Sequence, residues 1–182
     1  MTEYKEHEIK ILNIDVKKLV EKLDEIGAKK VYEDTRKIIT LDTADRLFLD
    51  QKDKLIRVTD EGSIKVSIHV NQSKPEIKET IKFKASRLKE TIDFFHEMGL
   101  DPISKVEADR ISYELGKIDF DIDKFPAIPP FLEIDIEFLE DEGYTLESLL
   151  KILGIENNKS VVMGTEDIHK LYGIDYFNEY KA

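Results

Sequence analysis

An alternation of polar and apolar side chains near the start of the chain constrains the fold most. Residues 6–12 read Glu-His-Glu-Ile-Lys-Ile-Leu. Successive side chains of a β-strand point to opposite faces, so Glu6, Glu8 and Lys10 share one face and the other face is mostly apolar. An amphipathic strand with its polar face in water accounts for this pattern. A functional site also explains the pattern, and the residues of the other predicted strands are needed to choose between these two interpretations.

Length and charge limit the classes of protein to which this chain can belong. Its 182 residues predict a single domain, residues 1–182, with a substantial core. The 28 Lys and Arg against 39 Asp and Glu give a formal charge of −11. Such a balance argues against nucleic acid as a partner, because binding it requires a basic face. The balance leaves room for a local basic pocket.

Two absences in the sequence narrow the chemistry further. The chain has no cysteine, which excludes disulfides and thiolate metal sites. Any metal ion must then be held mainly by carboxylates, which suit Mg²⁺, Mn²⁺ or Ca²⁺. There is neither a signal peptide nor an apolar run that could span a membrane, so we expect a cytoplasmic protein without a membrane partner.

Apolar periodicity predicts eight strands and four helices. The strands are expected at residues 6–12, 36–42, 54–60, 64–70, 80–83, 105–115, 117–124 and 131–139, and the helices at residues 16–26, 88–98, 145–153 and 165–172. Asp15 and Thr165 are expected to cap the first and last helices. Residues 80–83 correspond to residues 8–11 at an offset of 72, which predicts a strand–helix–three-strand unit used twice.

The predicted strands carry charge on one face and apolar side chains on the other. The polar face carries Glu6, Glu8, Lys10, Arg57, Thr59, Lys65, Ser67, His69, Lys78, Thr80, Lys82, Arg110, Ser112, Asp119, Asp121, Asp123, Glu133, Asp135 and Glu137. Amphipathic helices must cover the apolar face, so the expected fold is α+β, a closed eight-stranded antiparallel β-barrel with helices on the outside and charge inside. Charges in such a barrel need water, ions or a charged ligand. An open sheet with its charged face in water is the alternative.

Several segments resemble the CYTH family, the triphosphate tunnel metalloenzymes. Glu6-x-Glu8-x-Lys10 resembles the opening motif of the family, and Leu41-Asp42-Thr43 resembles its turn after the second strand. Residues 56–59 resemble its Leu-Arg-Ile-Arg strand, and residues 131–135 resemble its Phe-x-Glu-Ile-Glu strand. The resemblance extends over nearly the whole chain and implies a triphosphate tunnel.

The resemblance also implies a divided site. Glu6, Glu8, Asp123, Glu133 and Asp135 would bind Mg²⁺ or Mn²⁺ as cofactor. The triphosphate would be bound by Lys10, Arg57, Lys65, His69, Lys82 and Arg110, of which Lys10, Arg57 and Arg110 would also act in catalysis. The chain departs from the family where cations are expected, since Thr59, His69 and Ala108 stand at these positions. A protonated His69 would restore part of the missing positive charge.

Three functions follow from this pattern. The first is a metal-dependent phosphohydrolase acting on an inorganic or organic triphosphate, and it is preferred because the sequence shows no clear adenine pocket. The second is a class IV adenylate cyclase that converts ATP to cyclic AMP and pyrophosphate. The third is a noncatalytic triphosphate-binding module with a degenerate site, which the missing cations would favour. The sequence leaves the oligomeric state open, a homodimer included.

Overall fold

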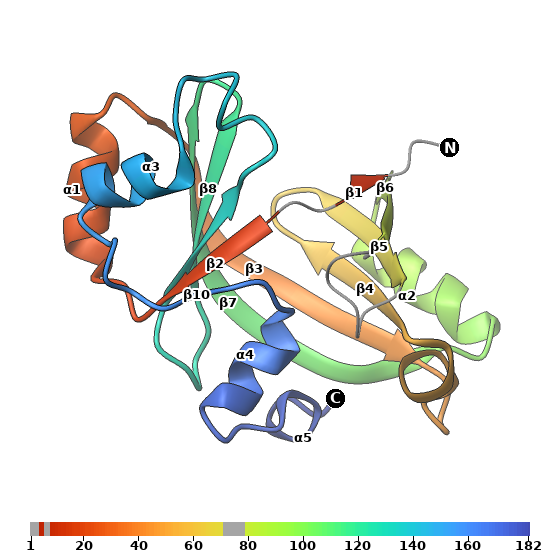
Figure 1. The fold of residues 1–182 in the computed structure, drawn as a ribbon. Helices are drawn as coiled ribbons and strands as arrows, with labels where there is room; N and C mark the ends of the chain where they lie inside the picture. Colours follow the sequence, from red (N-terminus) through yellow and green to blue (C-terminus); the bar gives the residue numbers. More distant parts are fainter. Residues whose placement is uncertain (1–3, 6–7, 71–78) are drawn as a thin grey trace. The chain divides into compact units, whose positions relative to one another are not determined.

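The structure, a computed structural model, describes residues 4–5, 8–70 and 79–182 (Figure 1). The chain divides into two compact units, and each unit is assembled from segments that are distant in sequence. The first unit comprises Met1–Glu6, Thr35–Ala108 and Gly164–Ala182, and the second comprises His7–Asp34 and Asp109–Met163.

The chain combines α-helices with antiparallel β-strands, which confirms the predicted α+β class. In chain order the elements are β1 (Tyr4–Lys5), β2 (Glu8–Leu12), α1 (Val16–Glu25), β3 (Lys29–Asp42), the π-helical turn η1 (Leu47–Gln51), β4 (Lys54–Asp60), β5 (Ile64–Val70), β6 (Glu79–Ala85), α2 (Leu88–Glu97), β7 (Asp101–Leu115), β8 (Ile118–Lys124), β9 (Phe131–Asp135), α3 (Leu146–Leu153), β10 (Ser160–Val161), α4 (Thr165–Leu171) and α5 (Tyr176–Glu179). None of the described helices has the length and apolar character needed to cross a membrane.

The predicted internal repeat is present in the order of the elements. Strand β2, helix α1 and strands β3–β5 form one strand–helix–three-strand series, and β6, α2 and β7–β9 form the next. The compact units cut across this repeat, because β2 and α1 belong to the second unit whereas β4 and β5 belong to the first, and β6 and α2 belong to the first unit whereas β8 and β9 belong to the second. Strands β3 and β7 are longer than predicted, and each contributes residues to both units.

The strands of each unit pair antiparallel in an open order. In the first unit the order is β1-β6-β5-β4-β3, and in the second it is β7-β8-β9-β2-β10. The described residues form ten strands rather than eight, because the two-residue strands β1 and β10 add to the predicted set. Their pairings do not close the strands into a ring, so the predicted eight-stranded barrel is not confirmed.

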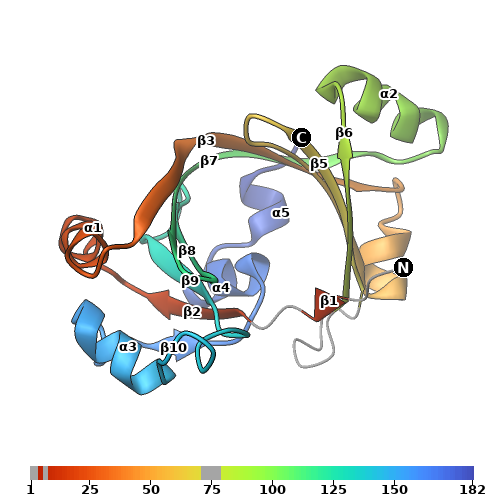
Figure 2. The ribbon, with the colours of Figure 1, turned by 90° about the horizontal axis from the view of Figure 1, so that it is seen from above.

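The core of the second unit lies between its strands and helices α1 and α3. These helices lie side by side (Figures 1 and 2). Leu19 and Leu23 of α1 and Leu149 and Leu153 of α3 are buried against the apolar face of the strands. That face is formed by Ile9, Ile11, Ile111, Tyr113, Ile118, Phe120, Ile122, Leu132 and Ile134. The period-2 pattern of these strands therefore predicted which face is covered.

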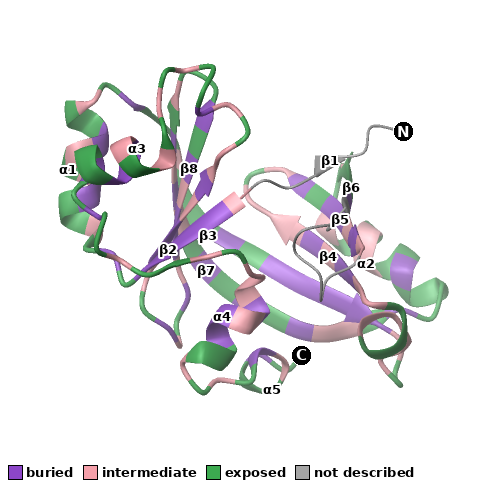
Figure 3. Cartoon of the chain, viewed as in Figure 1, coloured by how far each residue is buried: buried purple, intermediate pink, exposed green. Residues whose placement is uncertain are grey.

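The first unit has its own core beneath helix α2. Phe95 of α2 and the following Leu100 pack on Ile56, Val58 and Val66, together with Ile39, Leu41 and Ile64. The apolar face of every strand was predicted to be covered by helices. This prediction was wrong for strand β6, where Ile81 is 46% and Phe83 55% exposed. Helix α2 covers strands β4 and β5 but leaves these two side chains in solvent. The outer surface of α2 is exposed as well (Figure 3).

The loop after β3 is organised by Asp42, whose side chain is buried. Its carboxylate accepts hydrogen bonds from the backbone N–H groups of Thr43 at 2.7 Å, Phe48 at 3.0 Å and Leu49 at 2.9 Å. Because the carboxylate satisfies these donors, the segment Leu47–Gln51 folds into the π-helical turn η1. The Leu41-Asp42-Thr43 segment that stands out in the sequence thus shapes this loop.

The two expected helix caps have different outcomes. Asp15 caps α1 as predicted, since its side chain accepts a hydrogen bond from the N–H of Lys18 at 3.2 Å. Thr165 does not cap α4, because the helix already includes Thr165 and Gly164 stands at the cap position without a side-chain hydrogen bond.

An imidazole is fully buried among aromatic rings in the C-terminal segment. His169 Nδ1 lies 2.8 Å from the carbonyl oxygen of Thr165, and Nε2 lies 3.2 Å from the hydroxyl oxygen of Tyr180. The rings of Tyr176 and Tyr180 meet it edge-on. Burial lowers the pKa of His169, and the Thr165 carbonyl and the charge of Glu166 oppose this effect.

We expect stability to fall on acidification because of His169. Its pKa is near 6.5 in the unfolded chain and lower in the folded protein. The unfolded state therefore binds more protons, and the free energy of unfolding decreases as the pH falls through this range. Urea unfolding between about pH 5 and 7.5 should give a steeper pH dependence for the wild type than for His169→Gln. Equal slopes for the two proteins would contradict the assignment.

Candidate functional site

In the second unit, the pairing of β2 with β9 brings predicted site residues from the two ends of the chain together. The register places Glu8 opposite Asp135 and Lys10 opposite Glu133. Strand β8 then places Asp121 opposite Glu133. Directly paired residues have their side chains on the same face of the sheet. Carboxylates from strands β2, β8 and β9 therefore share one face of this unit.

Two cations bind these carboxylates. Arg110 of β7 is paired with Asp121, with Asp123 at 2.6 Å and with Glu133 at 2.7 Å. Lys10 lies 3.0 Å from Glu133 and 3.4 Å from Glu8. Both cations, which the resemblance assigns to phosphate, are thus held by acids in this structure. A phosphate group could bind Lys10 and Arg110 only by competing with the carboxylates, or after a metal ion has coordinated the carboxylates.

The titration behaviour of the cluster follows from burial and charge. Burial lowers the pKa of Lys10, but Glu133 and Glu8 outweigh it and the pKa is raised. For Arg110, burial also lowers the pKa, whereas Asp123, Asp121 and Glu133 together raise it. Burial raises the pKa of Asp121; Arg110 opposes this shift, and Glu133 and Asp123 add to it. Lys10 and Arg110 therefore keep their positive charges, while the negative charges of the carboxylates lie close together and repel one another.

Carboxylates outnumber cations in this cluster. Among the described residues, the four carboxylates of Glu8, Asp121, Asp123 and Glu133 are paired with the two cations Lys10 and Arg110. Carboxylate oxygens are the ligands that Mg²⁺ and Mn²⁺ prefer. Within residues 8–70 and 79–182, no three His, Asp or Glu side chains are arranged to hold a metal ion. The expected ligand Glu6 lies outside the described residues, as does Lys78.

The first unit carries a row of polar side chains across four strands. Thr40 of β3 lies opposite Arg57 of β4, Arg57 lies opposite Ser67 of β5, and Ser67 lies opposite Lys82 of β6. The neighbouring row places Thr59, Lys65 and Lys84 opposite one another on β4, β5 and β6. Lys82 and Lys84 are exposed. This face of the first unit is therefore basic toward β6.

The C-terminal segment covers this face at Arg57. A guanidinium nitrogen of Arg57 lies 2.5 Å from a carboxylate oxygen of Glu166 on α4. The Glu166 side chain is only 9% exposed, and that of Arg57 is 19% exposed. The cation predicted to bind phosphate is thus occupied by an internal carboxylate that lies 109 residues away in the sequence.

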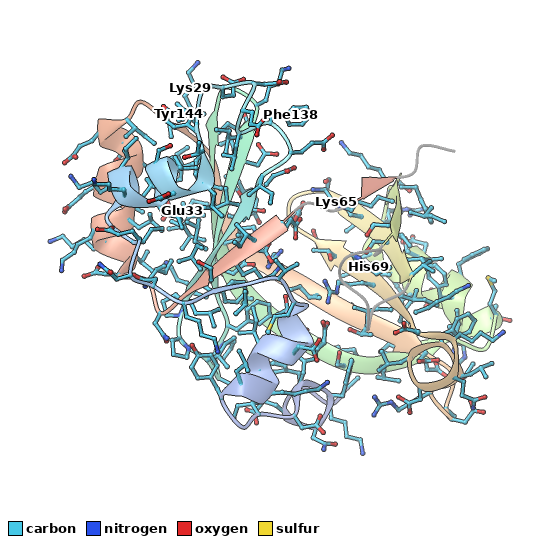
Figure 4. All side chains as sticks on the ribbon, viewed as in Figure 1. Lys29, Glu33, Lys65, His69, Phe138 and Tyr144 are labelled. Carbon is cyan, nitrogen blue, oxygen red and sulfur yellow. The ribbon has the colours of Figure 1, made fainter. Side chains whose placement is uncertain are left out.

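Lys65 and His69 lie on the same strand, β5, with different surroundings (Figure 4). Lys65 is half-exposed and pairs with Glu61. His69 is buried, with Nε2 3.1 Å from the hydroxyl oxygen of Ser67 and Nδ1 2.9 Å from that of Thr80. Its ring nitrogens therefore meet two hydroxyl groups, which can each donate or accept a hydrogen bond.

The structure distributes the predicted site residues between the two units. Lys10, Arg110, Glu8, Asp123, Glu133 and Asp135 lie in the second unit, and Arg57, Lys65, His69 and Lys82 lie in the first. Sequence reasoning placed Asp121 on the polar face of its strand but not among the metal ligands, although it alternates with Asp123 along β8. It also left out Glu166, for which no local sequence signal exists, because its contact with Arg57 is made only by the fold.

Solved structures with this fold have been described before. The chain is similar to a "putative adenylate cyclase" from Vibrio parahaemolyticus with a TM-score of 0.73 and 14% identity, covering 90% of this chain and 96% of that one. It is similar to a protein from Pyrococcus horikoshii OT3 with a TM-score of 0.66 and 19% identity, covering 87% and 94%.

A further structure comes from Hippeastrum. That protein is named as a "putative adenylyl cyclase" that reveals a dominant triphosphatase activity. The likeness has a TM-score of 0.60 and 12% identity, covering 91% of this chain and 94% of that one. The chain shares the fold of these proteins. No family model and no curated protein matches the sequence, so the likeness at this identity concerns the fold alone.

Proposed function

We propose that this protein binds a triphosphate together with a divalent cation and hydrolyses it. The observation that carries this proposal is the face of the second unit on which Glu8, Asp121, Asp123 and Glu133 gather around Lys10 and Arg110. A surplus of carboxylates suits a divalent cation, and guanidinium and ammonium groups suit phosphate oxygens. The shared fold with proteins named for cyclase and triphosphatase activities supports the same substrate class.

Each group has a defined part in this proposal. Glu8, Asp123, Glu133 and Asp135, together with Glu6, would hold Mg²⁺ or Mn²⁺. The bound cation would neutralise phosphate oxygens and polarise the phosphorus. In the second unit, Lys10 and Arg110 would bind phosphate oxygens and stabilise the charge that develops in the transition state. In the first unit, the predicted phosphate ligands are Arg57, Lys65, His69 and Lys82, with Arg57 also predicted to act in catalysis. The closed barrel stays a prediction, which a crystal structure with a bound triphosphate analogue would test.

Two other functions have specific support. The names of the similar structures from Vibrio parahaemolyticus and Bacillus halodurans favour a cyclase, in which the ribose 3′-hydroxyl attacks the α-phosphate of ATP. The internal ion pairs of Arg57 and Arg110 favour a binding module without turnover. We place hydrolysis first because the sequence carries no clear signature of an adenine pocket.

Product analysis separates these functions. The protein is incubated with inorganic triphosphate, thiamine triphosphate or ATP, each with Mg²⁺ or Mn²⁺. Release of inorganic phosphate is the expected result and would identify a hydrolase. Cyclic AMP with pyrophosphate would identify a cyclase, and binding without any product would identify a binding module.

Loss of one carboxylate should weaken the dependence on metal. Glu8→Gln and Glu133→Gln keep the size of the side chain and remove its charge, so half-maximal activation should need at least about tenfold more Mn²⁺. Activity is measured over a Mn²⁺ titration at saturating triphosphate. Glu107→Gln is the control, because the Glu107 side chain is exposed and lies 3.8 Å from Lys37. Unchanged Mn²⁺ titrations of both variants would refute the assignment of these carboxylates.

A further inference from the structure

Four large apolar side chains on strand β6 and helix α2 of the first unit are exposed to solvent. Ile81 is 46% and Phe83 55% exposed on β6, and Phe94 and Met98 are each 62% exposed on α2. Both elements belong to the first unit. Single apolar residues on a surface are common, whereas a group of them marks a surface that a partner covers. These four side chains are called the β6–α2 surface below.

The exposed part of β6 continues a face that is covered on the neighbouring strand. Phe83 lies directly opposite Val66 of β5, and paired residues share one face of a sheet. Val66 is completely buried, in the same core as Phe95 of α2. One helix therefore covers this face on β4 and β5. A second helix placed beside it would cover β6 in the same way.

Helix α2 also carries apolar side chains away from its own core. Leu88, Ile92 and Phe95 follow the helical repeat and pack on the strands. Phe94 and Met98 are four residues apart, so they lie one above the other on a different line of the helix. The outside of α2 is otherwise exposed (Figure 3). A helix that needed to cover only its own sheet would be polar on this line.

The charges of α2 are distributed unevenly along the helix. In chain order, the charged residues from its cap to its end are Arg87, Lys89, Glu90, Asp93, His96 and Glu97. The first half is therefore net positive and the second half net negative, which opposes the helix dipole at both ends. The pairs Arg87–Glu90 and Lys89–Asp93 are exposed, and exposed pairs contribute little stability.

This distribution fits a second copy of the same helix. When two such helices pack antiparallel, the positive half of each lies against the negative half of the other. A parallel arrangement would bring like charges together. An antiparallel pair of identical helices is what a two-fold axis generates. The charges of α2 thus favour a two-fold contact between identical chains.

The edge of β6 is unsuitable for such a contact. Lys82 and Lys84 alternate with Ile81 and Phe83 along this strand and are exposed. Two β6 strands paired antiparallel about an axis centred on this segment would set lysine opposite lysine. Like charges directly opposite one another destabilise a strand pair, and lysines protect edge strands from pairing. The second copy would therefore be bound by the apolar face and not by the edge.

The exposed apolar area is sufficient for a dimer. A large apolar side chain has roughly 150–250 Å² of surface, so four that are about half exposed present roughly 400 Å². A standard interface buries about 800 Å² on each partner, of which somewhat more than half is apolar. The β6–α2 surface supplies most of this apolar part, and the charged residues of α2 supply a polar rim.

We propose that the β6–α2 surface is the contact between two copies of this chain. The two α2 helices would lie antiparallel about a two-fold axis, and each would cover Ile81 and Phe83 of the other copy. The contact lies within the first unit and uses no residue of the acidic cluster. The inference therefore goes beyond the proposed function and does not depend on it.

Sedimentation equilibrium of the full chain tests this proposal. At micromolar concentrations we expect twice the 21.2 kDa mass of one chain. Phe94→Ser and Phe83→Ser should each weaken association at least about tenfold, because aromatic residues at the centre of an interface carry much of its binding energy. Leu171→Ser is the matched control, since Leu171 is 47% exposed on α4 of the same unit, and it should associate like the wild type.

A charge exchange tests the antiparallel arrangement. Arg87→Glu and Glu97→Arg should each weaken self-association at least about tenfold, because each brings like charges together at both ends of the contact. An equimolar mixture of the two variants should associate as tightly as the wild type, since both ends of the mixed dimer then join arginine with glutamate. Thermal unfolding of each variant shows whether it is folded.

The other outcomes would overturn the proposal. A wild type that stays monomeric up to its solubility limit would assign the surface to a different protein. A dimer that Phe94→Ser and Phe83→Ser leave unchanged would place the contact elsewhere on the chain. If the mixture of Arg87→Glu and Glu97→Arg associates no better than either variant alone, the antiparallel arrangement is wrong. Hydrolysis of triphosphate is measured separately and is not decided by these results.

Discussion

Replacing Arg110 by methionine is expected to lower the free energy of unfolding by about 3–5 kcal/mol. The side chain is 14% exposed and is paired with Asp121, Asp123 and Glu133. Methionine fills a similar volume but leaves these carboxylates without their shared cation. Removal of one partner from a buried network costs more than the network contributes in total, because the remaining charges stay desolvated. Urea unfolding at neutral pH measures the change.

Two comparisons make this result specific. Lys117→Met removes an exposed ion pair with Asp141 in the same unit and should change stability by less than about 1 kcal/mol. Adding Mn²⁺ should stabilise Arg110→Met more than the wild type, since a cation that binds the folded state raises its stability and the variant has more unpaired carboxylates. A loss as small as that of Lys117→Met would show that Arg110 is not the counter-ion of the cluster. Equal stabilisation of both proteins by Mn²⁺ would contradict the metal site.

Replacing Glu166 by glutamine is expected to strengthen the binding of a triphosphate about tenfold. The carboxylate holds Arg57 at 2.5 Å, so phosphate must displace it before it can bind this guanidinium. A charge-assisted hydrogen bond contributes roughly 1.5–3 kcal/mol, and 1.4 kcal/mol corresponds to about a factor of ten in affinity. Calorimetric titration with a nonhydrolysable imido analogue of triphosphate, at fixed free Mg²⁺, measures the effect.

The controls lie in the same helix and in the same ion pair. Asp167→Asn removes an exposed carboxylate of α4 that pairs with Lys170, and affinity should stay at the wild-type value. Arg57→Lys should weaken binding, because lysine lacks the planar fork that binds two oxygens. If Glu166→Gln and Asp167→Asn bind the analogue equally, the Glu166 carboxylate does not compete with phosphate.

The cations that were predicted to bind phosphate have one feature in common in the described structure. Each cation that the resemblance assigns to phosphate, among Lys10, Arg57 and Arg110, is bound by carboxylates of its own unit. Substrate binding would then exchange internal partners for phosphate and metal. Such an exchange makes the affinity for triphosphate depend on the stability of the internal ion pairs. The Glu166 variant tests this by removing a carboxylate, and the Arg110 variant tests it by removing a cation.

The sequence alone determined most of the local structure. The alternation in residues 54–60 and 64–70 predicted strands β4 and β5, because a period of two is enough to fix which side chains share a face. Strand β9 (Phe131–Asp135) is the first part of the strand predicted at residues 131–139. The repeat of a strand, a helix and three strands was also readable, since it depends on order along the chain. The same alternation identified most of the residues of the acidic cluster, although it did not show which cations would bind them.

Only the tertiary structure decided how these faces are used. Strand register set Glu8 opposite Asp135 and Lys10 opposite Glu133, and no local pattern contains the register of strands that are distant in sequence. The placement of α2 left Ile81 and Phe83 exposed, because one helix covers only part of a sheet face. The contact of Glu166 with Arg57 arises in the same way: it joins residues 109 positions apart, and its free energy exists only once the chain has folded and excluded water from both groups.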